Sequence, residues 1–159
     1  MTVIQAYERG LTAVRSANPD VRLSLSRDPE LADETVLVVE YPGSTGEPAE
    51  RDVWCDAEDQ DWTSGRAISF RIKPDQALRL SVSFMDGNRV AYTSWLDLEG
   101  GAWQTMEIPF SEIKPNPYFQ PPEADTDASL DVSEVAHIGF APQANPAGRL
   151  VISKFVVVD

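Results

Sequence analysis

Residues 67–110 read AISFRIKPDQALRLSVSFMDGNRVAYTSWLDLEGGAWQTMEIPF and contain four apolar-alternating runs separated by turn residues. In 67–73 and 78–84 a large apolar residue stands at every second position, with serine, arginine or lysine between. A period of two places these sets on opposite faces of a β-strand, so each strand has a core face and a wet face. Asp86-Gly87-Asn88 and Gly100-Gly101 supply hairpin turns. The stretch therefore predicts a four-stranded meander.

Composition limits the partners that the chain can have. Its 159 residues, 42% hydrophobic, suit one domain with a real core. A net charge of −13 argues against nucleic acid or an anionic membrane, because both require clustered cations. The single cysteine, Cys55, excludes an internal disulfide. There is no run of 18 apolar residues, and the N-terminus does not resemble a signal peptide.

The remaining segments predict further strands. Residues 1–20 stay undecided between helix and strand, because their apolar spacing is nearly helical while Gly10 weakens a helix. The β-branched run 35–41 is typical of a central strand. The segment 111–134 holds four prolines and many acids, which predicts a long loop. About nine strands without an interior helix predict one all-β domain over 1–159, a two-sheet antiparallel β-sandwich or jelly roll.

Catalytic and metal-binding motifs find little support. The only histidine is His137, and GxSxG, HExxH, a phosphate-binding glycine loop and paired cysteines are all missing. The acidic segments 56–61 and 123–134 lack the glycine and glutamate that a calcium loop requires at its sixth and twelfth positions. We therefore expect no enzyme activity and no metal, and we interpret both segments as solvated turns.

Some aromatic and polar residues alternate with the apolar core residues along the predicted strands, so they should face away from the core and could form a binding face. Trp54 lies opposite Val53 and Cys55, and its ring suits the apolar C–H face of a sugar. One of Tyr92 and Trp95 should also face solvent. The candidate ligand-binding residues are Trp54, Arg71, Arg79, Tyr92, Trp95, Tyr118 and His137.

These candidates have simpler interpretations as well. Arg71 and Arg79, expected on the polar faces of adjacent strands, either bind sugar hydroxyls or are merely solvated. Tyr118 and Phe119 either wall a groove or, as we favour, plug the end of the sandwich.

Several motifs in order resemble a known family. They are Asp61-Trp62-Thr63, the DGN hairpin, WQTMEIPFS at 103–111, and LDVSEVAHIGFAP at 130–142 leading into LVISKFVVV. Over about residues 23–158 the chain is similar to the galactose-binding-like jelly-roll domains of family-eleven carbohydrate-binding modules and of the mitochondrial complex I intermediate-associated protein.

The resemblance implies a non-catalytic module that docks a polysaccharide or oligosaccharide on a concave sheet face. The alternative is a protein-interaction or assembly-factor domain without a sugar ligand. An extracellular or periplasmic location and packing roles for Trp62 and Trp103 are also implied.

Modules of this type often hold a structural calcium between an acid near the first strand and an aspartate in the last. Tyr7-Glu8-Arg9-Gly10 resembles the first context, but Lys154 stands near the place of the aspartate. An ammonium there disfavours calcium, so we expect no cofactor. Our hypothesis is that Lys154 replaces the cation and pairs with Glu8; the alternative is a solvated lysine.

Overall fold

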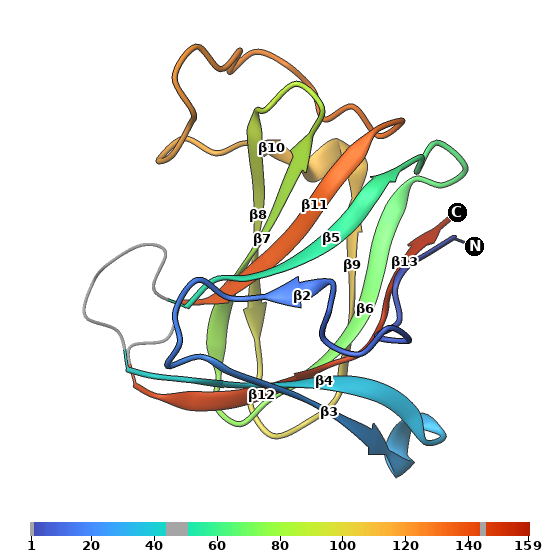
Figure 1. Ribbon diagram of the computed structural model, residues 1–159, viewed down its shortest axis with the longest axis vertical. Helices are drawn as coiled ribbons and strands as arrows, with labels where there is room; N and C mark the ends of the chain where they lie inside the picture. The colour runs from blue at the N-terminus through green and yellow to red at the C-terminus, as the bar shows by residue number, and fades with distance from the viewer. Residues whose placement is uncertain (1, 44–50, 144–145) are drawn as a thin grey trace.

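The computed structural model describes residues 2–43, 51–143 and 146–159, which form two antiparallel sheets packed face to face (Figure 1). Sheet A consists of β1 (Thr2–Gln5), β3 (Arg22–Asp28), β4 (Glu34–Tyr41), β6 (Ala67–Pro74), β9 (Gln104–Pro109), β12 (Gly148–Ile152) and β13 (Phe155–Val158). Sheet B consists of β2 (Val14–Arg15), β5 (Val53–Gln60), β7 (Leu78–Asp86), β8 (Ala91–Leu98), β10 (Lys114–Pro115) and β11 (Val135–Pro142). The described residues contain two 3₁₀ turns, Pro29–Leu31 and Phe110–Glu112, and no α-helix. The predicted all-β sandwich is confirmed.

The strand order places the two ends of the chain together. In sheet A, β4 lies between β3 and β12, and β12 followed by β13 pairs along one edge of β6 while β9 pairs along the other. β1 pairs with β13, so both termini lie side by side (Figure 1). Sheet B has the order β10-β8-β7-β11-β5-β2. Residues 1–20 thus supply a strand to each sheet.

The predicted meander is wrong, because of its four strands, β6 to β9, only β7 and β8 form a hairpin. The chain passes from sheet A to sheet B after Pro74 and returns after Leu98, where β9 pairs with β6. The two connections pack together: the amide of Gly101 donates to the carbonyl of Pro74 at 2.7 Å, and a side chain at Gly100 would meet the backbone of Gln76. The glycines therefore serve a crossover between sheets, not a hairpin.

The β7–β8 turn differs from its expected form in one detail. The positive φ angle falls on Arg89, at 60°, and not on the residues of the DGN motif. Asp86 is buried, and its carboxylate accepts hydrogen bonds from the amides of Asn88 and Asp131 at 3.0 and 2.9 Å. This aspartate joins the turn to the loop that follows β10.

Alternate residues of both sheets fill one core around Trp62. The centre of its indole lies 6.2 Å from the centre of the stacked Phe110 ring and 6.1 Å from that of Phe84, which it meets edge-on. The indole Nε1–H donates a hydrogen bond to Oε1 of Gln60 at 3.3 Å. The open end of the sandwich is covered by the partly buried residues Ala124, Ala128, Leu130 and Val132. Tyr118 and Phe119 do not plug it, since their exposed fractions are 87% and 62%. Their loop is held away from the core at the edge of sheet B.

We expect Trp62→Ala to lower the free energy of unfolding by about 3–5 kcal/mol, because it removes a fully buried ring and leaves a cavity. Trp54→Ala, on the outside of sheet B, is the matched control and should cost less than about 1 kcal/mol. Urea unfolding of both variants measures the difference. Equal losses would show that Trp62 is not the centre of the core.

Candidate functional site

The outer face of sheet B carries a row of four cross-strand neighbours: Trp54 on β5, Gly139 on β11, Ser83 on β7 and Thr93 on β8. A Cβ atom on Gly139 would lie 2.6 Å from the Trp54 ring, so the indole lies over the glycine backbone. The hydroxyls of Ser83 and Thr93 are 3.4 Å apart. Any larger residue at 139 would displace the indole, and glycine therefore sets its position.

A second row runs beside the first and contains Ala141 on β11, Ser81 on β7 and Trp95 on β8. The guanidinium of Arg79 lies 5.8 Å from the centre of the Trp95 ring. The side-chain amide of Gln143 donates a hydrogen bond to the Ser81 hydroxyl at 3.3 Å. This row ends in an indole with a cation over it and leaves small side chains beside it.

Together the two rows place Trp54 and Trp95 on either side of a strip of small residues. β5 and β8 are separated by β11 and β7, so the strands that carry the two tryptophans lie about 14 Å apart. The strip consists of Ser81, Ser83 and Ala141, together with Gly139 under the Trp54 indole. We call these four residues, with the two tryptophans, the sheet B platform.

The loop after β10 adds a third ring to this platform. Tyr118 meets Trp95 edge-on at 6.1 Å. Asn116 holds the loop by donating to the Thr93 hydroxyl at 3.0 Å and accepting from the Tyr118 amide at 2.8 Å. The side-chain amide of Gln120 bonds both the N–H and the carbonyl of Ala91, at 3.1 and 2.8 Å. These bonds extend the sheet edge and fix the backbone that carries the exposed tyrosine.

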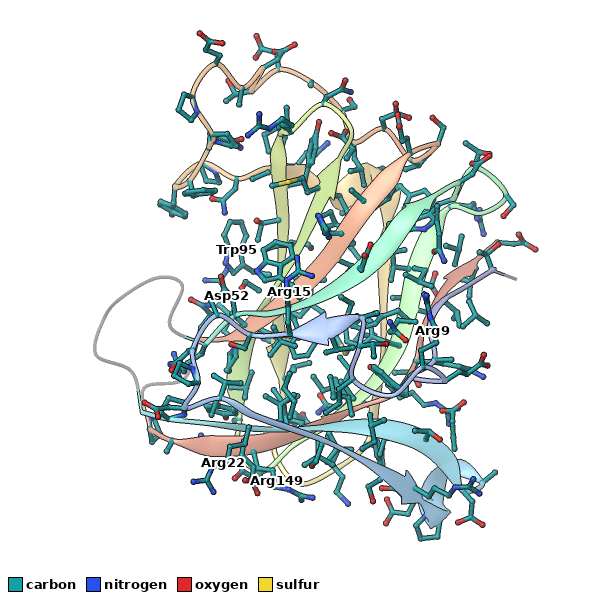
Figure 2. The ribbon with its side chains drawn as sticks, in the orientation of Figure 1. Arg9, Arg15, Arg22, Asp52, Trp95 and Arg149 are labelled. Atoms are coloured by element: carbon teal, nitrogen blue, oxygen red, sulfur yellow. The ribbon has the colours of Figure 1, made fainter. Side chains whose placement is uncertain are left out.

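Asp52 immediately precedes β5 and shares the outward parity of Trp54. Figure 2 shows its side chain on the same side of the molecule as Trp95 and Arg15. Burial raises the pKa of the Asp52 carboxyl. The folded protein therefore carries a partly desolvated hydrogen-bond acceptor on the outer side of sheet B, two positions from Trp54.

Neither reactive side chain of this region is set up for catalysis. Cys55 points into the core, and burial raises the pKa of its thiol to about 12, which keeps it protonated. His137 contacts Trp54 edge-on at 6.4 Å, and its Nδ1 is buried without a hydrogen-bond partner among the described residues. The imidazole thus packs against the indole and has no acid beside Nδ1 to orient it.

Five of the seven candidate residues lie together: Trp54, Arg79, Trp95, Tyr118 and His137 all belong to the outer side of sheet B or its edge loop. Two do not join them. Tyr92 pairs with Phe84 and is fully buried, so its place in the ligand set was wrong. Arg71 is also misplaced, because β6 belongs to sheet A and its arginine is on the opposite side of the sandwich from Arg79.

Sequence reasoning did not select several residues that the fold brings beside the rings. Asp52 could have been selected from the sequence, because it stands two positions before Trp54 and so faces the same side of the strand. An acidic residue two positions from an aromatic one is too common a pattern to be selective. Gln143 and Gly139 carried no readable signal, because their importance comes from cross-strand contacts with Ser81 and Trp54.

Lys154 does form an ion pair, but the partner is Glu34 and not Glu8 as hypothesised. The Nζ atom lies 2.9 Å from Oε1 of Glu34, and both side chains are partly buried. The second oxygen of Glu34 is buried without a described partner. One carboxylate beside an ammonium does not fit the six to eight oxygen ligands of calcium. No group of three or more His, Cys, Asp or Glu that could hold a metal occurs within 2–43, 51–143 and 146–159.

Among these residues there is no helix of sufficient length and apolarity to span a membrane.

The sequence profile of the family described as "Carbohydrate binding domain (family 11)" matches residues 23–156. Endoglucanase H of Acetivibrio thermocellus is 29% identical over 110 residues, which cover 63% of this chain but only 12% of that protein. This chain therefore corresponds to a small part of that relative's length.

Solved structures share the fold. The family 11 carbohydrate-binding module from Clostridium thermocellum in complex with a β-1,3-1,4-mixed-linked tetrasaccharide has a TM-score of 0.73 at 22% identity, covering 99% of this chain and 94% of that one. A family 30 carbohydrate-binding module has a TM-score of 0.64 at 13% identity, covering 100% of this chain and 85% of that one. At these identities the likeness establishes the jelly-roll architecture alone.

We expect Lys154→Met to destabilise the protein by about 1–3 kcal/mol, because it leaves the Glu34 carboxylate partly buried without its cation. Lys73→Met, which removes the more exposed 3.6 Å pair with Glu30, is the matched control and should cost about 1 kcal/mol or less. Thermal unfolding with and without calcium measures both effects. A rise of the wild-type Tm with saturable calcium binding would show that Lys154 does not replace the ion.

Proposed function

Because this chain belongs to the family 11 carbohydrate-binding domains, we propose that it binds an extended neutral glycan on the sheet B platform. The observation that carries the proposal is the placement of Trp54 and Trp95 in adjacent cross-strand rows with only small residues between them. The domain is a non-catalytic binding module whose partner is carbohydrate.

The chemistry of the platform suits a sugar chain that crosses the strands. Each indole offers a flat apolar surface to the C–H face of a pyranose ring. Between the rings, Ser81 and Ser83 expose hydroxyls without bulk, so a saccharide can approach the backbone of β7. Arg79 supplies donors at one side, and Asp52 supplies an acceptor near the end of the second row.

The biological setting belongs to the proposal. One solved relative is the family 11 module of a cellulosomal cellulase of Clostridium thermocellum, which supports a role as the targeting part of a longer enzyme. That setting favours an extracellular or periplasmic location for this chain. In this proposal neither a metal nor another cofactor takes part in glycan binding.

A protein-docking role, which the resemblance of the sequence to the mitochondrial complex I intermediate-associated protein implied, is the second candidate; the comparisons support the family 11 part of that resemblance and not this part. One observation favours it: Tyr118 and Phe119 are neighbouring, exposed aromatic residues at the edge of sheet B. The glycan proposal uses Tyr118 as an extension of Trp95 and leaves Phe119 without a role. The docking role would be favoured if the wild type bound no sugar but bound a protein partner, and if Phe119→Ala lost the binding of that partner.

Removing either platform tryptophan should weaken binding of a β-glucan oligosaccharide by about 2–4 kcal/mol, roughly 30- to 1000-fold in Kd. Trp54→Phe should retain part of the affinity, because it keeps an aromatic surface. Calorimetric titration and Trp fluorescence, against a panel of β-glucans, xylans, mannans and simple sugars, measure the loss. Arg79→Ala should also weaken binding, because Arg79 lies beside Trp95, and Arg71→Ala, an equally exposed strand arginine away from Trp95, is its matched control and should not. No wild-type binding across the panel would overturn the proposal.

Asp52→Asn should bind the glycan more weakly, by about 1.5–3 kcal/mol, because it loses a charged hydrogen-bond acceptor. The same variant should be more stable than the wild type at neutral pH. The folded-state pKa of Asp52 is raised, so the folded wild type loses stability relative to the unfolded chain as pH rises through the interval between the two pKa values.

The two Tm curves should therefore converge below the ordinary aspartate pKa of about 3.9 and separate above it. Thermal unfolding at several pH values and titration at neutral pH check both parts. A variant that is less stable than the wild type at neutral pH would show that the folded state favours the Asp52 carboxylate.

A further inference from the structure

The outer face of sheet A holds a hollow of about 390 Å³ that the glycan proposal does not use. Its floor consists of Val36 and Val38 of β4 and Val151 of β12, whose exposed fractions are 1%, 6% and 8%. In Figure 2, Arg149 projects from β12 on the side of sheet A that faces away from Trp95. The hollow therefore lies on the opposite side of the sandwich from the sheet B platform.

The polar rim of the hollow is balanced in charge. Lys73 and Arg149 contribute two cations, and Asp28 and Asp75 contribute two carboxylates. Lys73 is held by Glu30 at 3.6 Å. Within the part of the chain that the structure describes, no hydrogen bond or ion pair occupies the Arg149 guanidinium or the Asp75 carboxylate. As far as residues 2–43, 51–143 and 146–159 are concerned, the rim thus keeps one donor group and one acceptor group without a partner.

Trp103 stands beside the same valines. It packs against the cluster formed by Leu31, Val36, Val38 and Val151, on the outside of sheet A and not in the main core. Its Nε1–H is buried and has no acceptor among the described residues. Trp103 does not itself line the hollow, so its indole supports the valine floor from the side.

We propose that this hollow is a second ligand site, for a neutral saccharide of roughly one or two rings, which its volume accommodates. A pyranose ring has a circumference of hydroxyls that matches the polar rim, and its apolar C–H face would lie over the small exposed area of the valine floor. Each hydroxyl both donates and accepts, so a sugar can use the Asp75 carboxylate and the Arg149 guanidinium together.

The balance of charges selects the neutral class over a uronic acid. Two rim cations face two rim carboxylates, and Glu30 already engages Lys73, so an added carboxylate finds no excess positive charge. This site is independent of the sheet B platform and would let one domain contact two glycan chains or two parts of one chain.

Amide chemical-shift titration of the ¹⁵N-labelled wild type tests the proposal, because each amide reports on its own face. The probes are glucose, cellobiose and glucuronate at millimolar concentrations. Cellobiose should shift the amides of Val38, Gly101 and Val151 saturably. Shifts at Ser83 and Gly139 report separately on the sheet B platform, so failure of one site is distinguishable from failure of the other.

Arg149→Ala should weaken the response at Val38 and Val151 at least tenfold while leaving the response at Ser83 unchanged. Arg71→Ala is the matched control: its arginine is exposed on the same sheet face but does not line the hollow, so both responses should remain. Both side chains are exposed, so neither substitution should change the Tm.

The absence of saturable shifts at Val38, Gly101 and Val151 would overturn the site. A stronger response to glucuronate than to cellobiose would overturn the neutral class. An unchanged response in Arg149→Ala would show that the polar rim does not bind the saccharide and would overturn the proposed mode of recognition.

Discussion

The backbone hydrogen bonds that hold β11 between β5 and β7 determine which side chains can act together. They set Gly139 beside Trp54 on one edge and beside Ser83 on the other. The same ladder turns Ile138 and Phe140 into the core, where both are buried. Because side chains alternate along a strand, a slip of one residue would expose these apolar groups and bury the platform. The strand pairing that stabilises the sandwich therefore also positions the candidate site, and a change in the register of β11 would disrupt both.

This dependence explains how much could be predicted from the sequence. The period of two was sufficient to predict that Trp54 and Arg79 face away from the core. It could not predict which sheet a strand joins, so Arg71 and Arg79 were expected on adjacent strands although β6 and β7 belong to different sheets. Tyr92 and Trp95 are three positions apart and must face opposite ways, but alternation alone does not say which is inside. The pairing of Tyr92 with Phe84 decides it.

Loop residues were the hardest to place, for a different physical reason. Tyr118 follows prolines and has no periodicity to orient it. Its position depends on the side-chain amides of Asn116 and Gln120, which bond Thr93 and the backbone of Ala91. Such contacts join residues far apart in sequence and leave no local pattern. The apolar composition of the loop suggested a core plug, whereas the residues that cover the core are the small and aliphatic ones of the following segment.

The charges of the molecule further constrain how a glycan could be recognised. A neutral sugar gains nothing from the long-range field of a chain with net charge −13, so its affinity must come from contacts at short range. The sheet B platform provides these through indole surfaces, and its charged neighbours Arg79 and Asp97 partly neutralise each other at 4.0 Å. The hollow on sheet A follows the same rule with two cations against two carboxylates. On both faces, charges of both signs lie around the candidate site. This arrangement keeps the hydrogen-bonding groups available while it avoids a net attraction for ions that would compete with a sugar.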